Sequence, residues 1–352
     1  MSVPVCGTQG SDENGQLASY NLLKGKWQAH FGYRHFRSFR HFVGSVEQNA
    51  ENAAKGLAER DRASTNVINH VHQPSLAVSY GVTDRLSVSA DLPYFHAHRR
   101  SPGPPTGPRP TFVTAASGIS DLTLTGRYWL SDPATYSDWN VSLGLGFKLP
   151  TGNDRAEDDF LVRPVEDGVR VTQRRPVDQS IQPGDGGYGF VPELQAFKVL
   201  GRFVAFVSGT YLINPEETND FLRGGPSANV DTSGAENHLL SIADQYAARV
   251  GVSTSVKSLG VNLGLRWEGT RGSDLIGGDR GRRRPGYTLG IDPGVSYTWR
   301  GTHFTLNVPY AIRRVRNQNF ADKLESLESG HFETGDAAFA DYAILVGFSR
   351  RF

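Results

Sequence analysis

Cysteine is almost absent from this chain, and so is any long apolar stretch. Cys6 is the single cysteine among 352 residues, so no disulfide can form within the chain. The segment around Cys6 lacks the small-residue pattern of a lipoprotein site, and we interpret it as an ordinary residue near a loose N-terminus, with lipidation as the alternative. Hydrophobic residues make up 38% of the chain, and no run approaches the roughly 18 apolar residues of a membrane helix, which excludes a helical membrane protein.

A surplus of one charge sign is missing too. The formal net charge is +1, which implies no bulk attraction to nucleic acid, and we expect no nucleic-acid partner. The first 20 residues have neither a basic start nor an apolar run, so we expect that the leader of an exported protein has been removed. Residues 1–24 are polar and are predicted to form a flexible tail or a plug in a lumen.

What the chain does have is alternation of apolar and polar residues, most clearly at its end. Every second residue of the last segment is apolar, and the other row is polar or small. A period of two predicts a strand with two chemically different faces. A soluble sandwich strand is the alternative, but a terminal aromatic residue that closes such a strand is typical of bacterial outer-membrane barrels. We therefore predict that Phe348 and Phe352 form an assembly signal for the barrel-assembly machinery.

The alternation recurs along the whole chain. It predicts about twelve strands, at residues 26–39, 66–80, 85–98, 119–130, 139–149, 187–199, 202–214, 246–258, 261–269, 287–299, 302–313 and 341–352, although the parity of 187–199 and 202–214 is ambiguous. Connections near residues 82, 135, 201, 259 and 301 are short, whereas those between them are long, and residues 51–60 are prone to helix. This order predicts an all-β fold: a transmembrane antiparallel up-and-down barrel formed by residues 25–352, with short periplasmic turns and long extracellular loops.

The predicted inward row is rich in glycine and carries balanced charge. The glycines favour an open passage, and the alternative is that they allow curvature or receive a plug. A charged lumen either fills space or selects polar solutes, and the balance of signs predicts weak charge selectivity at most. The candidates for the lumen lining are Arg34, Asp91, Asp121, Arg127, Lys148, Glu193, Arg249, Arg266, Glu268, Asp292, Arg313 and Asp341.

Two basic groups are predicted to lie near the outer mouth. Pairing about the turn at residues 81–84 brings four outward-facing histidines together, and a second cluster follows Arg280 in a loop. We expect both to contact lipid headgroups and lipopolysaccharide phosphates, with a metal site as the alternative for the histidines and a substrate clamp as the alternative for the arginines. A barrel lipid hydrolase needs a serine beside them, and none has clearly matching parity and height. The residues are His70, His72, His96, His98, Arg282, Arg283 and Arg284.

Four short segments that span predicted turns and strands resemble the sequences of a known family. They are the runs at residues 80–94 (YGVTDRLSVSADLPY), 118–128 (GISDLTLTGRY), 146–152 (GFKLPTG) and 182–187 (QPGDGG). The chain resembles the outer-membrane proteins named for the meta-pathway of phenol degradation, and the likeness covers most of its length. The resemblance implies a barrel that admits hydrophobic or aromatic compounds.

The combined hypothesis is a channel of the bacterial outer membrane for passive passage of small solutes, among them hydrophobic or aromatic ones. A closed barrel that acts structurally or binds partners through its long loops is the second hypothesis, and we rank a lipid hydrolase below both. We expect no enzymatic activity and no cofactor.

Overall fold

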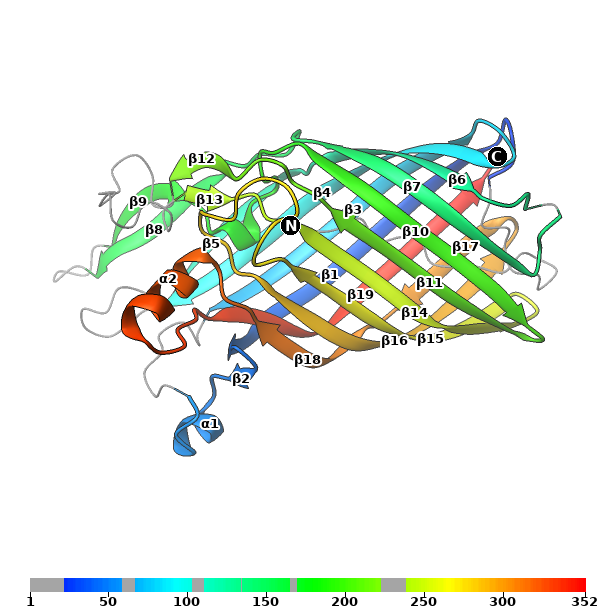
Figure 1. The fold of residues 1–352 in the computed structure, drawn as a ribbon. Coiled ribbons are helices and arrows are strands. Elements are labelled where there is room, and N and C mark those ends of the chain that lie inside the picture. The colour runs from blue at the N-terminus through cyan, green and yellow to red at the C-terminus, as the bar shows by residue number, and fades with distance from the viewer. Residues whose placement is uncertain (1–21, 59–66, 103–110, 134, 165–169, 223–238) are drawn as a thin grey trace.

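The computed structural model describes residues 22–58, 67–102, 111–133, 135–164, 170–222 and 239–352, so Cys6 and most of the predicted N-terminal segment lie outside the described residues. Within these ranges, one antiparallel sheet closes on itself to form a barrel (Figure 1). Its strands are β1 (Trp27–Val43), β3 (Ile68–Gly81), β4 (Leu86–Pro102), β5 (Thr111–Ile119), β6 (Leu122–Trp129), β7 (Trp139–Leu149), β10 (Gly189–Leu200), β11 (Phe203–Leu212), β14 (Gln245–Val256), β15 (Leu259–Thr270), β16 (Gly286–Trp299), β17 (Thr302–Asn307), β18 (Tyr310–Arg316) and β19 (Ala337–Arg351).

The barrel has twelve strands in its wall, as the alternation predicts. β5 and β6 follow each other in one position of the wall, because both pair with β4, and β17 and β18 share another position beside β16. If the strands in the loops are set aside, the remaining wall strands follow one another around the ring in chain order. The first and last strands close the ring through a long register that runs from Gln28 opposite Arg351 to Phe42 opposite Ala337. Pairing of the first strand with the last closes the two ends of the sheet, whose backbone groups lipid could not satisfy.

The distribution of side chains is inverted relative to a soluble protein. Leu145 and Leu263 are 63% and 53% exposed on the outer face, whereas Asp292 and Asn307 are fully buried inside. Alternate residues of each strand face opposite sides, so one row meets lipid and the other meets the lumen. The ambiguous pair follows the same rule, because Val204 and Phe206 are buried and Phe203 is exposed.

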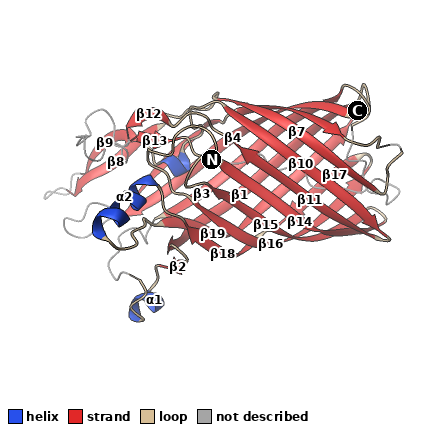
Figure 2. Ribbon diagram, in the orientation of Figure 1, coloured by secondary structure: helices blue, strands red, loops and turns tan. Residues whose placement is uncertain are grey.

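Short and long connections lie at opposite ends of the barrel, as predicted. The two-residue turns after β10, β14 and β16 lie at one end together with the C-terminus (Figure 1). The other end carries the loops, with the helices in them drawn in blue in Figure 2. These loop elements are β2 (Val46–Glu47), α1 (Ala50–Ala54), β8 (Glu157–Pro164), β9 (Arg170–Pro176), the 3-10 helix η2 (Gln179–Ile181), β12 (Thr218–Leu222), β13 (Leu239–Ser241) and α2 (Phe320–Ser329). Neither described α-helix is long and apolar enough to cross a membrane.

Two strand predictions need correction. Residues 111–118 lie between the strands predicted at 85–98 and 119–130, but they belong to β5, which continues the wall toward the outside. The predicted strand at 302–313 is interrupted between β17 and β18, where Pro309 removes a backbone donor. The small strands β8, β9, β12 and β13 lie in segments that sequence periodicity had assigned to loops.

Candidate functional site

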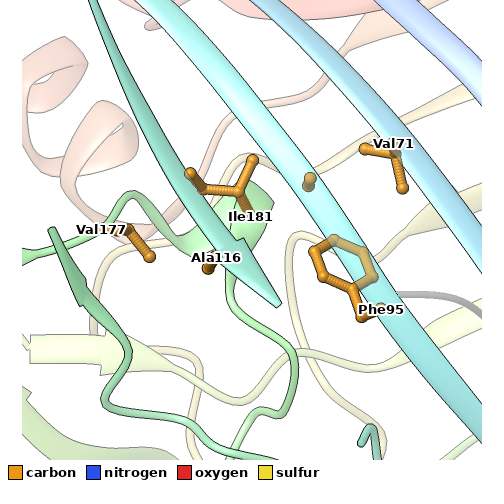
Figure 3. Close-up of a cluster of buried hydrophobic side chains, with 6 residues drawn as sticks. Val71, Phe95, Ala116, Val177 and Ile181 are labelled. Carbon is orange, nitrogen blue, oxygen red and sulfur yellow. The ribbon is translucent and has the colours of Figure 1, made fainter. Parts of the chain in front are cut away.

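The candidate functional site is the interior of the barrel, and its extracellular half is occupied by an inward-folded loop. We call residues 177–187, between β9 and β10, the lumen loop. Val177 and Ile181 of this loop pack against inward-facing Val71, Phe95 and Ala116 of the wall (Figure 3). Ile181 and Ala97 are fully buried, so the loop and the inner face of β3, β4 and β5 form one small apolar core.

Ion pairs fix this loop across the mouth of the barrel. Asp178 caps η2 and accepts two hydrogen bonds from Arg284, at 2.7 and 3.0 Å, while Arg99 of β4 lies 3.5 Å away. Burial opposes ionisation of Asp178, but Arg284 and Arg99 outweigh it and hold the pKa of this carboxyl well below its usual range. Arg99 and Arg284 come from well-separated wall positions, because Arg284 precedes β16, so the lumen loop spans the mouth between them.

Further bonds hold the second half of the lumen loop. The Gln182 amide donates to the carbonyls of Val177 and Ala156, at 3.1 Å each, and accepts from the Ala156 backbone. Lys148 of β7 forms an ion pair with Asp185 and lies 3.9 Å from Asp121. The loop therefore contacts β3, β4, β5 and β7 and forms part of the barrel interior.

A second set of charges crosses the lumen below the loop. Arg34 of β1 donates to Glu268 of β15 at 2.9 Å, and the shorter way around the ring from β1 to β15 passes β19, the shared position of β17 and β18, and β16. Arg266 lies 3.7 Å from Glu268 and 3.2 Å from Asp292, and Arg249 lies 2.7 Å from Asp292. These residues form a continuous chain of charges of alternating sign.

On another part of the wall, an ion pair between β6 and β10 lies over a glycine of the strand between them, β7. Arg127 of β6 donates two hydrogen bonds to Glu193 of β10, at 2.6 and 3.2 Å. A Cβ on Gly144 would lie 3.0 Å from the Glu193 side chain and 3.2 Å from that of Arg127. At Gly294 the space is taken by Asn307 in the same way. These two glycines therefore make room for neighbouring polar side chains, which replaces the interpretation that they leave an open passage.

A cavity of about 500 Å³ lies between the lumen loop and the Arg34–Glu268 pair. Its lining combines charged groups, such as Arg34, Glu268 and Asp341, with apolar ones, such as Phe36 and Ala340. The Arg34 guanidinium lies 5.2 Å from the centre of the Phe36 ring, so cationic and aromatic surfaces meet at its wall. A volume of this size matches pockets for small organic molecules.

The wall beside this cavity is not fully hydrogen-bonded. β18 and β19 pair at Tyr310 and Tyr342, and within the described part of the chain no further register joins the extracellular part of β18 to β19. The Arg314 side chain spans the break by donating to the Ala340 carbonyl at 3.0 Å and to Asp341 at 2.6 Å. The cavity is lined by residues of both edges, among them Ala311 and Ala340.

This irregularity explains an error in the predicted lining. Eleven of the twelve predicted lumen residues are buried or half-buried on the inner side, but Arg313 is exposed, and buried Arg314 takes its place. A register shift between Leu289 and Gly290 inverts the parity of β18 at that point. The sequence signal for Arg314 was present in the run of two arginines, but alternation alone selected the wrong one.

The arginine loop also departs from the prediction. Arg283 is 1% exposed and donates two hydrogen bonds to Asp274, and Arg284 binds Asp178. Arg282 lines the cavity. Because all three contribute to the interior, the prediction that they contact lipopolysaccharide phosphates is wrong for Arg283 and Arg284.

The four predicted histidines do lie on the outer face. His70, His72 and His98 are half-buried and His96 is exposed, whereas their neighbours Phe95 and Ala97 are buried inside. Among the described residues, no group of three metal-binding side chains is arranged to hold a metal ion. The structure also places Ser117 of β5 opposite His96, a neighbour that sequence reasoning missed because residues 111–118 lie outside the predicted strands. Serine alone, with no described hydrogen bond to His96, does not make a nucleophile.

The predicted assembly residues lie at the seam of the barrel. Phe348 is opposite Phe31 of β1 and contacts Phe304 of β17 edge to face, with ring centres 5.3 Å apart. The Phe352 backbone exchanges hydrogen bonds with Trp27 at 2.9 and 3.3 Å, and its side chain is exposed. Both lie where the last strand closes on the first.

Comparison with known proteins is informative at the level of fold. No family model matches the chain, and no curated protein matches its sequence. An outer membrane channel of Pseudomonas putida F1 has a similar structure, with 14% identity, a TM-score of 0.57, and coverage of 95% of this chain and 98% of that one. More distant are the translocator domain of the autotransporter NalP from Neisseria meningitidis (TM-score 0.48, 11% identity, coverage 94% and 89%) and the P. putida toluene transporter TodX (TM-score 0.45, 10% identity, coverage 97% and 93%). The fold is that of outer-membrane barrels, and membership of the meta-pathway family stays a prediction.

Proposed function

We propose that the protein is an outer-membrane channel for passive passage of small solutes. The observation that carries this proposal is the cavity of about 500 Å³ inside a closed barrel, between the lumen loop and the Arg34–Glu268 pair. A barrel with a purely structural role has no need of such a space, whereas a channel needs a place where a solute leaves bulk water. The solved structure with a similar fold is described as an outer membrane channel.

Hydrophobic or aromatic solutes are the class that we favour. Phe36 and the alanines at the break between β18 and β19 give the cavity an apolar side, and the resemblance to the meta-pathway family points to the same class. The break supports this choice, because a wall segment held by Arg314 rather than by backbone bonds opens at less cost than a paired one.

A closed barrel that acts through its loops is the second candidate. It is favoured by the two bridges that cross the interior, at Asp178 and at Arg34, because both obstruct a straight path. Uptake of a labelled aromatic solute by cells that carry the protein separates the two hypotheses. A channel raises the initial uptake rate over cells that carry an empty vector, and a closed barrel leaves it unchanged.

A further inference from the structure

The outer face of the barrel carries a compact basic surface that the channel function does not use. We define the histidine patch as His35, His70, His72, His96, His98 and Arg37. Its residues form two cross-strand rows over β1, β3 and β4. In one row His35 is opposite His72, which is opposite His96, and in the other Arg37 is opposite His70, which is opposite His98.

The imidazole rings in these rows are in contact. The rings of His35 and His72 stack with centres 4.4 Å apart, and those of His70 and His98 stack with centres 4.5 Å apart. His72 and His96 are 6.1 Å apart. Such close rings cannot all carry a positive charge without a counter-ion, since like charges disfavour ionisation.

Hydrogen bonds orient two of the rings. His35 Nδ1 lies 3.0 Å from the Val71 carbonyl oxygen, which can only accept, so Nδ1 carries a hydrogen and Nε2 is free of one in the neutral ring. The Tyr33 hydroxyl lies 2.7 Å from His72 Nδ1. The remaining nitrogen of His35 becomes a donor only when the ring takes up a proton.

The place of the patch in the wall defines its ligand. Tyr33 and Tyr94 are the next outward residues toward the middle of β1 and β4, and the exposed side chains of Leu76 and Leu92 follow. Aromatic residues of barrels mark the level of the lipid headgroups, and the leucines belong to the apolar band. A ligand on the patch therefore has its polar part at the imidazoles and an apolar part along the band, which describes a membrane lipid.

Charge complementarity selects an anionic headgroup. Outward positions of β1, β3 and β4 near the patch add exposed Arg100, and the facing β5 and β19 positions Ser117, Ala115 and Ile344 are uncharged. Asp158 of β8 brings a carboxylate to this side, since it accepts a hydrogen bond at 2.6 Å from the backbone of Ala115, the residue opposite His98. Phosphate oxygens are the acceptors that several protonated imidazoles and a guanidinium bind best.

We propose that the histidine patch binds the phosphate groups of outer-leaflet lipids and that this binding strengthens as pH falls. Binding and proton uptake are linked, because a phosphate supplies the counter-charge that lets stacked rings ionise. One proton taken up together with the lipid gives about a tenfold gain in affinity per pH unit over the range in which the linked imidazole titrates.

Titration of the detergent-solubilised protein with a bisphosphorylated lipid A, followed by native mass spectrometry at pH 7.5 and pH 5.5, tests this proposal. The variant replaces His70, His72, His96 and His98 by glutamine, and His331→Gln in the exposed loop after α2 is the matched control. Wild type and control should bind at least tenfold more tightly at pH 5.5. The fourfold variant should lose this dependence and bind at least tenfold more weakly.

Three results would overturn the proposal. They are unchanged lipid binding by the variant, equal binding of lipid A without its phosphates, and loss of zinc binding without loss of lipid binding, which would mark a metal site. If the fourfold variant does not assemble, as judged by its heat-dependent shift on a gel, the pairs His70→Gln with His98→Gln and His72→Gln with His96→Gln replace it, and the same expectations apply to each.

Discussion

Asp178→Asn is the substitution that acts most directly on the closed mouth of the barrel. The amide has nearly the shape of the carboxylate, but it leaves Arg284 and Arg99 without the negative charge that lies 2.7 and 3.5 Å from them. Removal of one partner from a buried ion pair costs about 3–5 kcal/mol. Because the Asp178 side chain is 11% exposed, we take the lower end, about 3 kcal/mol, which shifts the equilibrium toward a released lumen loop about 100-fold.

Single-channel recording in planar bilayers measures this shift. The variant should spend a larger fraction of time in a state of higher conductance, and amide exchange of residues 177–187 should accelerate. Glu325→Gln on the exposed face of α2 is the control for loss of one carboxylate, and it should behave as wild type. Equal open fractions and equal amide exchange in Asp178→Asn and wild type would refute the conclusion that this ion pair holds the lumen loop across the mouth.

The pH dependence of the wild type follows from the same pair. The pKa of Asp178 is lower in the folded protein than in the unfolded chain, where aspartate titrates near 3.9. A depressed pKa contributes stability that is present above the unfolded value and is lost as pH falls through the folded value. The contribution of Asp178 to protection of the lumen loop should therefore be constant from pH 8 to pH 5 and decline only below about pH 4.

Three further substitutions probe other parts of the account. Ile181→Ala should weaken docking of the lumen loop by about 2–5 kcal/mol, because it empties a fully buried site, and faster proteolysis at the loop with an unchanged heat-dependent gel shift would measure it. Glu268→Gln should make the channel more selective for anions, because it removes the carboxylate that pairs with Arg34 and lies 3.7 Å from Arg266, and an unchanged reversal potential in a salt gradient would speak against the charge chain. Phe352→Asp should impair assembly into the outer membrane, whereas Phe352→Leu should be tolerated, and equal membrane levels of both would remove the assembly role.

The wall of the barrel was predictable because a lipid-facing surface imposes a strict period of two. Every predicted strand is present, and β7 has the predicted bounds. The alternation failed where the backbone leaves the regular register. The register shift beside Gly290 places Arg314 rather than Arg313 inside the barrel. Two adjacent arginines look alike in the sequence, so alternation cannot predict this bulge.

The interior was less predictable, because it depends on contacts between segments far apart in the chain. The sequence identifies Arg34 and Glu268 as inward charges, but 234 residues separate them, and only the closed ring brings them together. The lumen loop was missed for the same reason. Asp178 and Arg284 look like exposed loop residues in the sequence. They become buried because the two loops that contain them fold over the same mouth of the barrel.

Conductance of the purified protein in planar bilayers distinguishes a channel from a closed barrel. A channel gives discrete openings of the intact chain that become longer or larger in Asp178→Asn, together with faster uptake of an aromatic solute by cells that carry either protein. Deletion of residues 1–24 in parallel tests whether the N-terminal segment acts as a plug. If the intact protein, the deletion and Asp178→Asn are all silent and none speeds uptake, the barrel is closed and the channel proposal is wrong.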